Sequence, residues 1–349
     1  MALPFLSGGG KKRDQIVAID LGTRNTKAVY VTRKGDTLTL ASYTIMDAPV
    51  YDRALSAEVL ADHLKAVMES LGTRHKHLCI SIGPGDSLVR HAELPVVTVN
   101  DMRQMLKFGS KNYLQQDLPE HLFDCEILAL PQGEVGKAAK CKVLVGGAKK
   151  QLVTEVQNAA KQAGLVADSI TTGLVGPANA LELSLPDVYS KEIIAVVDFG
   201  FKNSSISIVM DGKLALNRVV GYGAAKLTTG IAETLGVPTA EAESVKMNMP
   251  QEVQEAIQPL LTPLGRELRA SIDFFEHQND KTVSQVFFCG GSAKAEPIVS
   301  ALQSELMVPC KNWNPTVALT LQLDAQRMSE LEPNSPQLAV AIGAAVSTF

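Results

Sequence analysis

Residues 16–31 read IVAIDLGTRNTKAVYV, and this stretch decides the fold. Two apolar runs, residues 16–20 and 28–31, flank the polar segment 21–27, a pattern that predicts two strands joined by a tight turn. Asp20 closes the first run. Its carboxylate is therefore expected at the rim of a sheet, beside the turn.

A comparable stretch occurs in the second half of the chain, where residues 193–210 read IIAVVDFGFKNSSISIVM. The pattern predicts strands over residues 193–198 and 205–210, a turn over residues 199–204, and a second strand-end carboxylate, Asp198. Two lobes that open with the same unit indicate a weak internal duplication at the level of structure.

Composition narrows the class of protein. The chain has 349 residues, of which 46% are hydrophobic, enough to bury the cores of two or more domains. A net charge of -4 argues against nucleic acid as a partner. The five cysteines are scattered without a C-x-x-C pair, which disfavours a zinc site or a disulfide framework and favours a reducing cytoplasm.

Membrane insertion is not expected from the sequence. It contains no run of about 18 apolar residues, and its first residues lack the pattern of a signal peptide. A partner would therefore have to recruit the chain to a membrane.

The periodicity along the chain predicts a two-lobed α/β protein. Apolar residues at helical spacing predict helices over residues 57–71, 149–163, 225–235, 239–247, 261–277 and 337–346, and Asn100 is expected to cap one more. The expected parts are a flexible leader (1–14), a first lobe (15–190 with 335–349) with an inserted α/β subdomain (about 88–163), and a second lobe (191–334) with an outer subdomain (about 225–282).

The first turn has the residue types that hold a phosphate. A glycine, Gly22, lets backbone N–H groups approach an anion, and the side chains of Thr23, Arg24 and Asn25 add donors. Lys27 would offset the phosphate charge. Asp20 is placed to hold hydrated Mg²⁺, which needs only one or two carboxylates.

The second turn repeats this chemistry with Asp198, Gly200, Asn203 and Ser204. Taken alone, such a turn is as readily an ordinary hairpin turn. Two of them facing across a cleft would clamp a polyphosphate and its metal from both sides.

Two further elements are less specific. Gly290, Gly291 and Ser292 follow a buried strand, and glycines there would let a base or ribose lie against bare backbone, although such a pair is common in α/β proteins. Glu243 and Lys246 lie three residues apart on one helical face, where an exposed ion pair is the plain alternative.

The order of these elements resembles the phosphate, adenosine and connecting motifs of actin, Hsp70 and sugar kinases, which implies an actin-like, ribonuclease H-like fold. The finer resemblance is to the PilM family of type IV pilus assembly, a relative of the division protein FtsA. It is carried by residues 218–228, RVVGYGAAKLT, by Glu243 and Lys246, and by residues 93–95, 123–125 and 143–146 of the inserted subdomain. It implies that Gly221 and Gly223 belong to the nucleotide site.

This resemblance also implies a function. It implies a cytoplasmic, ATP-binding adaptor of type IV pilus or related type II secretion assembly, with Mg²⁺ held by Asp20 and Asp198 through water. The expected partner is the N-terminal tail of a PilN-like inner-membrane protein of the assembly platform, received between the inserted subdomain and the first lobe. At most a slow ATPase is expected, no catalytic residue is identified, and self-association is left open.

Three other functions share some of these motifs. A small-molecule kinase would need a general-base carboxylate beside an acceptor pocket, for which the sequence has no motif. An FtsA-like filament-forming protein shares most of them. A degenerate actin-fold scaffold without nucleotide would account for Phe201, Lys202 and Asn203, which replace the small, hydroxyl-rich residues common in the family's second turn.

Overall fold

The chain divides into two compact units. A computed structural model describes residues 1, 3–7, 13–49, 56–130, 139–248 and 251–349. Unit 1 comprises Met1–Asn179, Leu319–Gln322 and Val340–Phe349, and unit 2 comprises Ala180–Ala318 and Leu323–Ala339. The first break falls inside helix α4 (Gly176–Ser184) rather than at the expected residue 190, because one helix continues from one unit into the next without a local sequence signal.

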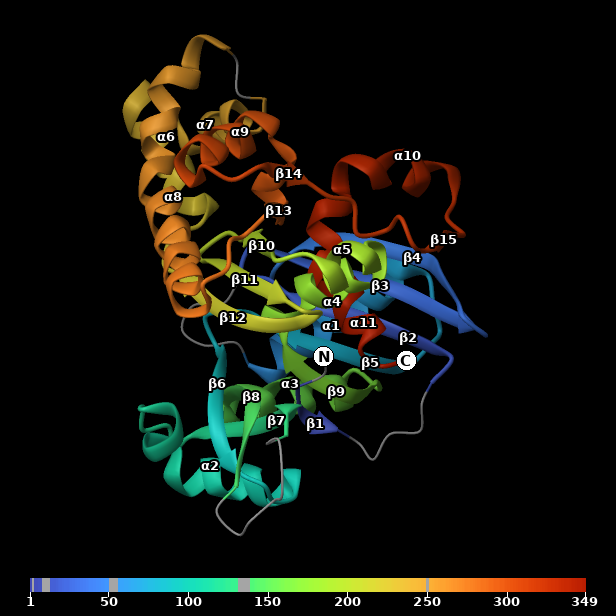
Figure 1. Ribbon diagram of the computed structural model, residues 1–349. Coiled ribbons are helices and arrows are strands. Elements are labelled where there is room, and N and C mark those ends of the chain that lie inside the picture. The colour runs from blue at the N-terminus through green and yellow to red at the C-terminus, as the bar shows by residue number, and fades with distance from the viewer. Residues whose placement is uncertain (2, 8–12, 50–55, 131–138, 249–250) are drawn as a thin grey trace. The chain divides into compact units, whose positions relative to one another are not determined.

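Unit 1 is built on a seven-stranded sheet in the order β1-β9-β5-β2-β3-β4-β15 (Figure 1). The predicted hairpin is confirmed: β2 and β3 pair antiparallel, and β2 runs parallel to β5. The strands are β1 (Pro4–Ser7), β2 (Gln15–Leu21), β3 (Asn25–Lys34), β4 (Thr37–Asp47), β5 (His77–Ile82), β9 (Val166–Thr172) and β15 (Thr320–Leu321).

Two helices, α1 (Ala57–Leu71) and α3 (Lys150–Gln162), bury their apolar faces against this sheet. The expected bounds of α1 are confirmed, because Ser56 accepts a hydrogen bond from Val59 N at its start and Gly72 takes a left-handed conformation at its end. The core of unit 1 therefore lies between sheet and helices.

The first residues differ from the expected flexible leader. Pro4–Ser7 forms β1 at the edge of the sheet, and Leu3 is fully buried. Gly8, Gly9 and Gly10, on which the leader prediction rested, lie outside the described residues. The error arises because the strand's partner, β9, is distant in sequence and leaves no local signal.

A smaller three-stranded sheet forms the inserted subdomain of unit 1. It pairs β6 (Ser87–Pro95), β8 (Lys140–Lys149) and β7 (His121–Ala129), and α2 (Val99–Leu114) covers one face. Thr98, not Asn100, caps α2, because the Thr98 hydroxyl accepts from Asp101 N, while the Asn100 side chain accepts from Arg103 instead.

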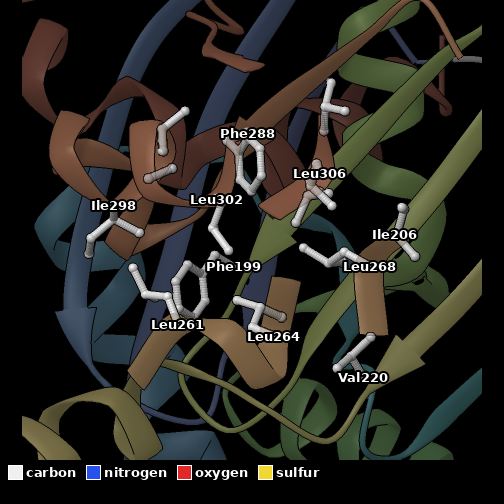
Figure 2. Close-up of a cluster of buried hydrophobic side chains, with 14 of the residues drawn as sticks. Phe199, Ile206, Val220, Leu261, Leu264, Leu268, Phe288, Ile298, Leu302 and Leu306 are labelled. Atoms are coloured by element: carbon white, nitrogen blue, oxygen red, sulfur yellow. The ribbon is translucent and has the colours of Figure 1, made fainter. Parts of the chain in front are cut away.

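Unit 2 is built on a five-stranded sheet in the order β12-β11-β10-β13-β14. Figure 2 shows its core, in which Phe199 and Phe288 of the sheet meet Leu261, Leu268 and Leu302 of the helices. The strands are β10 (Ile194–Phe199), β11 (Ser204–Met210), β12 (Lys213–Val220), β13 (Gln285–Cys289) and β14 (Cys310–Asn312). The helices are α6 (Ala224–Leu235), α7 (Thr239–Asn248), α8 (Gln251–Asn279) and α9 (Glu296–Leu306).

Helix α8 begins ten residues before the expected start at residue 261. Pro259 and Pro263 both lie inside it, and prolines usually mark a helix boundary in a sequence. Burial of Ile257 and Leu261 in the unit 2 core accounts for the longer helix, since tertiary packing overrides the local cost.

The remaining elements are short. They are η1 (Gly173–Val175), α5 (Pro186–Lys191), η2 (Gly291–Lys294), α10 (Ala325–Asn334), η3 (Ser335–Leu338) and α11 (Ala339–Val346). The helix expected over residues 337–346 is thus a 3₁₀ turn followed by α11. A Cβ at Gly343 of α11 would lie 1.8 Å from the Gly176 oxygen, so these helices meet backbone to backbone. Within the described residues, no helix is long and apolar enough to cross a membrane.

Candidate functional site

The first strand-end turn pairs a carboxylate with an ammonium group. Asp20 is 6% exposed and lies directly opposite Lys27 in the β2–β3 ladder. Lys27 Nζ is 3.1 Å from Asp20 Oδ2. The two side chains that were predicted to face a phosphate and its metal are therefore brought together at one end of the hairpin.

Gly22 closes this turn in a position that no larger residue fits. Its N–H donates to Asp20 O at 3.0 Å, and an added Cβ would lie 2.4 Å from Asn25 O and 2.7 Å from Lys27 Nζ. Thr23 and Arg24 are exposed at the tip. The Asn25 amide instead donates to Asp47 Oδ1 at 3.0 Å, so it braces the turn.

Thr26 and His63 support the turn and were not predicted. Thr26 is buried, and its hydroxyl lies 2.8 Å from His63 Nε2 of α1. Burial lowers the pKa of His63 below its ordinary value. Thr26 follows Asn25 in a polar run, and only the alternation of buried positions along β3 distinguishes it as inward-facing.

The second strand-end turn lies in unit 2 and contacts the Gly290 turn. β10 runs parallel to β13 with Asp198 opposite Cys289. An added Cβ at Gly290 would lie 2.7 Å from Asp198 Oδ1, and Gly290 has a φ of 93°. Two elements predicted separately, the second phosphate turn and the adenosine turn, are therefore in contact.

The rest of this turn packs against the start of α6. Gly200 O and Phe201 O accept hydrogen bonds from Ala224 N and Ala225 N, both at 2.9 Å. A Cβ at Gly223 would lie 2.4 Å from Phe201 O, so this position requires glycine. The first N–H groups of α6 thus donate their hydrogen bonds to backbone carbonyls of the turn.

Ser204 and Asn203 differ in accessibility. Ser204 is fully buried and its hydroxyl donates to Tyr222 O at 2.7 Å, so its proton is committed to the protein backbone. Asn203 is half-buried, and Lys202 beside it is exposed. Burial raises the pKa of Tyr222 to about 12, and its hydroxyl donates to Leu260 O, which fixes the segment between Gly221 and Gly223.

The ion pair on α7 has a buried lysine and a partly buried glutamate. Lys246 is 2% exposed, and its Nζ lies 2.8 Å from both carboxylate oxygens of Glu243 and 3.0 Å from Thr228 Oγ1 of α6. Thr228 Oγ1 also lies 2.8 Å from Glu243 Oε2. The alternative of an exposed ion pair is therefore wrong, and Thr228 is a third member that pair spacing alone did not identify.

Around the Gly290 turn, the neighbours come from the end of unit 2. Gly290 N donates to Pro336 O at 2.9 Å, and the Gln337 amide oxygen is the nearest atom to a Cβ at Gly291, at 3.5 Å. Ser292 is 2% exposed. Lys294 donates to Asn334 Oδ1, and burial lowers the Lys294 pKa. Lys294 is a polar neighbour that motif reasoning did not include, whereas Gln337 begins the helix expected over residues 337–346.

The candidate residues thus form three groups, each inside one unit. Unit 1 holds the Asp20–Lys27 turn, and unit 2 holds the Asp198–Gly290 contact and the Glu243–Lys246–Thr228 cluster. The expected approach of Asp20 and Asp198 across a cleft joins different units and stays a prediction.

Comparison with known proteins places these elements in a fold. Residues 18–349 match the family described as type IV pilus assembly protein PilM. Among solved structures, a chain of the PilM-PilN type IV pilus biogenesis complex is 22% identical, with a TM-score of 0.81 over 97% of this chain and 99% of that chain.

Two more distant structures share the architecture. The ethanolamine utilization protein EutJ from Carboxydothermus hydrogenoformans is 15% identical, with a TM-score of 0.53 over 95% of this chain and 88% of that one. MreB 5 of Spiroplasma citri, bound to AMPPNP, is 11% identical, with a TM-score of 0.53 over 95% of both. The predicted actin-like α/β fold is confirmed.

Proposed function

The chain belongs to the type IV pilus assembly protein PilM family, and on that premise we propose that it is a cytoplasmic, ATP-binding adaptor. It serves type IV pilus assembly or a related type II secretion system. It docks the N-terminal tail of a PilN-like inner-membrane protein, which recruits it to that membrane. The solved PilM-PilN complex supports this partner.

The observation that carries the nucleotide part of the proposal is the construction of the two strand-end turns. Each follows a buried strand whose penultimate residue is an aspartate, and each contains a glycine, Gly22 or Gly200, whose Cβ would lie within 2.5 Å of a backbone oxygen. Bare backbone beside a carboxylate is the arrangement that accepts a phosphate and its metal. AMPPNP bound to MreB 5, a protein of the same fold, supports the same ligand class.

The residues present fit ATP with Mg²⁺. Lys27 would neutralise phosphate charge, and Thr23 and Arg24, exposed at the tip, would donate hydrogen bonds. Asp20 and Asp198 would hold Mg²⁺ through its waters. When bound, the metal neutralises the charge of the phosphate oxygens. Lys27 already lies beside Asp20, so its ammonium also limits repulsion between that carboxylate and a polyphosphate.

The ribose and base would be held by groups of unit 2. Glu243 is 27% exposed at its side chain, whereas Lys246 is buried beneath it. Lys246 and Thr228 therefore fix the Glu243 carboxylate in one orientation, from which it would accept hydrogen bonds from ribose hydroxyls. Gly221, Gly290 and Gly291 would supply flat backbone surface for the nucleoside.

Binding rather than rapid hydrolysis is the proposed use of the nucleotide. Hydrolysis needs a group that orients or deprotonates water. The sequence identifies no residue for that role. Slow turnover at most is proposed. Any effect of ATP on partner binding then requires that the partner binds nucleotide-loaded and empty chains with different affinities.

Capture from membranes tests the adaptor. The tagged full chain and, for comparison, its D20A variant are each incubated with detergent-solubilised membranes of the source cell. A pilus-assembly membrane protein with a short cytoplasmic tail should be enriched and then released by excess synthetic tail peptide. Absence of any such protein from the bound fraction contradicts the adaptor. Long polymers sedimenting with ATP would instead indicate an FtsA-like filament protein.

A further inference from the structure

The N-terminal strand β1 occupies a sheet edge that would otherwise be open. β1 pairs antiparallel with β9, with Leu6 opposite Ile170 and Ser7 opposite Ser169. It also contacts β7 and β8 of the inserted subdomain, so it lies where the two sheets of unit 1 meet (Figure 1). This is the region proposed above to receive the partner's tail.

Two side chains from other parts of unit 1 donate hydrogen bonds to the backbone of residues 1 and 3. Thr171 Oγ1 donates to Leu3 O at 3.0 Å, and the Asn179 amide donates to Met1 O at 2.7 Å. Both contacts go to main-chain oxygens, which any extended peptide presents at the same spacing. These two hydrogen bonds therefore recognise an extended backbone and not one particular side chain.

The side chains of β1 fit against bare backbone on β8. An added Cβ at Gly146 would lie 3.0 Å from Leu3 Cβ and 3.4 Å from Phe5 Cε1. Leu3 is fully buried, whereas Phe5 is half-buried. The surface thus accepts two apolar side chains at alternate positions and has little room for anything larger beneath them.

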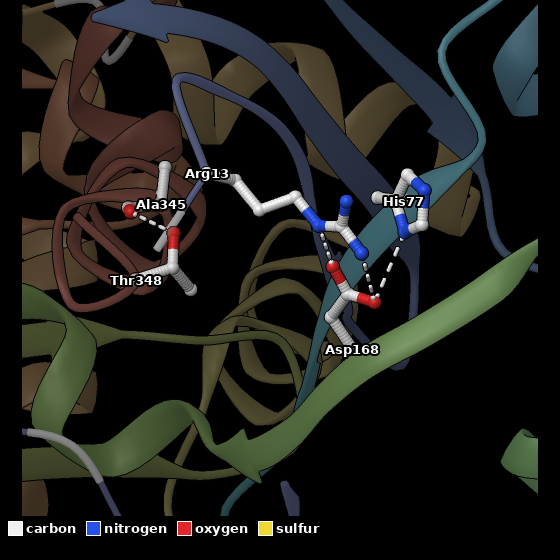
Figure 3. A network of polar contacts seen from close by, with 5 residues as sticks. All are labelled: Arg13, His77, Asp168, Ala345 and Thr348. Atoms are coloured by element: carbon white, nitrogen blue, oxygen red, sulfur yellow. Dashed lines mark hydrogen bonds and ion pairs between the residues drawn. The ribbon is translucent and has the colours of Figure 1, made fainter. Parts of the chain in front are cut away.

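The pairing is short and irregular. β1 has four residues, its register shifts between Pro4 and Leu6, and Pro4 has no N–H to donate. The chain is fastened again at Arg13, which forms an ion pair with Asp168, the residue before Ser169 on β9, while His77 Nδ1 lies 3.0 Å from the same carboxylate (Figure 3). β1 is therefore an occupant tethered beside its own site.

We propose that β1 is an intramolecular ligand of an edge-strand docking site, and that the tail of the membrane partner displaces it. This rests on the adaptor function proposed above. The partner segment is an extended, uncharged peptide with apolar side chains at alternate positions. It pairs antiparallel with β9, accepts the Thr171 hydrogen bond and rests on Gly146. Partner binding is thereby held in check by the chain's own first residues.

The covalent connection of β1 to the rest of the chain determines how strongly β1 weakens the binding of a free peptide. A strand joined covalently to the protein that binds it has an effective concentration of about 1 mM at its site. A free peptide that binds the vacated edge with a Kd of about 10 µM would therefore bind the occupied edge on the order of 100-fold more weakly. A tenfold difference is the smallest that this mechanism predicts.

The test uses the full chain and a labelled peptide with the sequence of residues 1–7, MALPFLS. The double variant L3D/F5D replaces the two apolar contacts with carboxylates, which cannot be buried beside Gly146 without a partner. We expect the peptide to bind L3D/F5D at least tenfold more tightly than wild type. Equal affinity within twofold, or no binding to a variant that melts as wild type does, overturns the proposal.

Neighbouring glycines supply a matched pair of controls. In the L3D/F5D chain, Gly146→Ala should weaken peptide binding severalfold. Gly147→Ala, whose Cβ would meet Leu88 and Phe123 at 3.1 Å on the opposite face of β8, should leave it unchanged. Equal effects of both substitutions contradict the placement of the site.

Hydrogen exchange on the wild-type chain gives a second readout that does not depend on the variants folding. Saturating peptide should expose the amides of residues 5–7 to exchange while those of β9 stay protected. Protection of residues 5–7 at full occupancy overturns the displacement. These results concern the chain and its own peptide, so they stand apart from membrane capture, and failure of the adaptor function is recognised separately.

Discussion

Substitution of Gly290 by alanine tests the contact between the Asp198 turn and the Gly290 turn. The Gly290 backbone has φ 93° and ψ 173°, a conformation that residues with a Cβ adopt at a cost of about 1–3 kcal/mol. The new methyl group would also lie 2.5 Å from Phe199 O and 2.7 Å from Asp198 Oδ1. Relieving that overlap costs about a further 1–3 kcal/mol. It also displaces the Asp198 carboxylate.

Gly236→Ala is the matched control. Gly236 also has a positive φ, 67°, but no atom lies within 4 Å of its added Cβ. Only backbone strain of about 1–2 kcal/mol is expected there. Because the two backbone strains are of similar size, most of the difference between the two variants, about 1–3 kcal/mol, comes from the crowding at Asp198.

Urea unfolding measures this difference directly in unit 2. The single tryptophan, Trp313, is 6% exposed and donates from Nε1 to Ser184 Oγ at 2.7 Å, so its fluorescence reports unfolding of that unit. If the free energy of unfolding falls by about 2 kcal/mol per M of urea, a difference of about 2 kcal/mol between the variants separates their unfolding midpoints by about 1 M urea. Equal unfolding midpoints for G290A and G236A, together with equal ATP affinities, would show that the Gly290 turn does not contact the Asp198 carboxylate.

Three other outcomes are expected. Lys246→Met should lower the free energy of unfolding of unit 2 by about 2 kcal/mol, because it leaves the partly buried Glu243 carboxylate without its cation, and urea unfolding followed by Trp313 measures it. Acidification from pH 8 to 5.5 should lower the melting temperature of unit 1. Burial lowers the pKa of His63 and His75, so the unfolded chain binds more protons below its ordinary histidine pKa and stability falls there. Cys79, whose pKa burial raises to about 12, should resist alkylation at pH 8 until the chain is denatured, as mass spectrometry of the labelled protein would report.

Each of these has a discriminating control. Lys191→Met removes the exposed cation that pairs with Asp187 on the surface and should leave the unfolding midpoint unchanged. His63→Gln should reduce the slope of melting temperature against pH, and an unchanged slope would exclude His63 as a contributor. Rapid alkylation of Cys79 in the native chain would contradict its burial.

Local patterns in the sequence identified the elements that hold the candidate site. The hairpin around Asp20 is marked by two apolar runs and a polar turn, and its strands form as expected. Helix α1 is marked by its spacing, its capping serine and its terminal glycine. These signals are readable because the hydrogen bonds and side-chain contacts that produce them lie within a few residues.

Contacts between distant segments were not readable. The strand Pro4–Ser7 depends on β9, and the burial of Lys246 depends on Thr228 of another helix. Neither the apolar start of the chain nor a Glu-Lys pair at helical spacing distinguishes these outcomes from a leader or a surface pair. Nonlocal packing decided both, and the sequence carries no local trace of it.

We propose that Asp20 and Asp198, one carboxylate from each unit, bind the same nucleotide, and titration with fluorescent ATP and Mg²⁺ tests this most directly. Wild type should bind one ATP per chain, and D20A and D198A should each weaken binding by at least about tenfold, because contacts of this charged kind contribute about 1.5–3 kcal/mol. The double variant should lose less than the sum of the single losses, since both groups act on the same ligand. Full-strength binding by either single variant, or no binding by wild type, would contradict the claim.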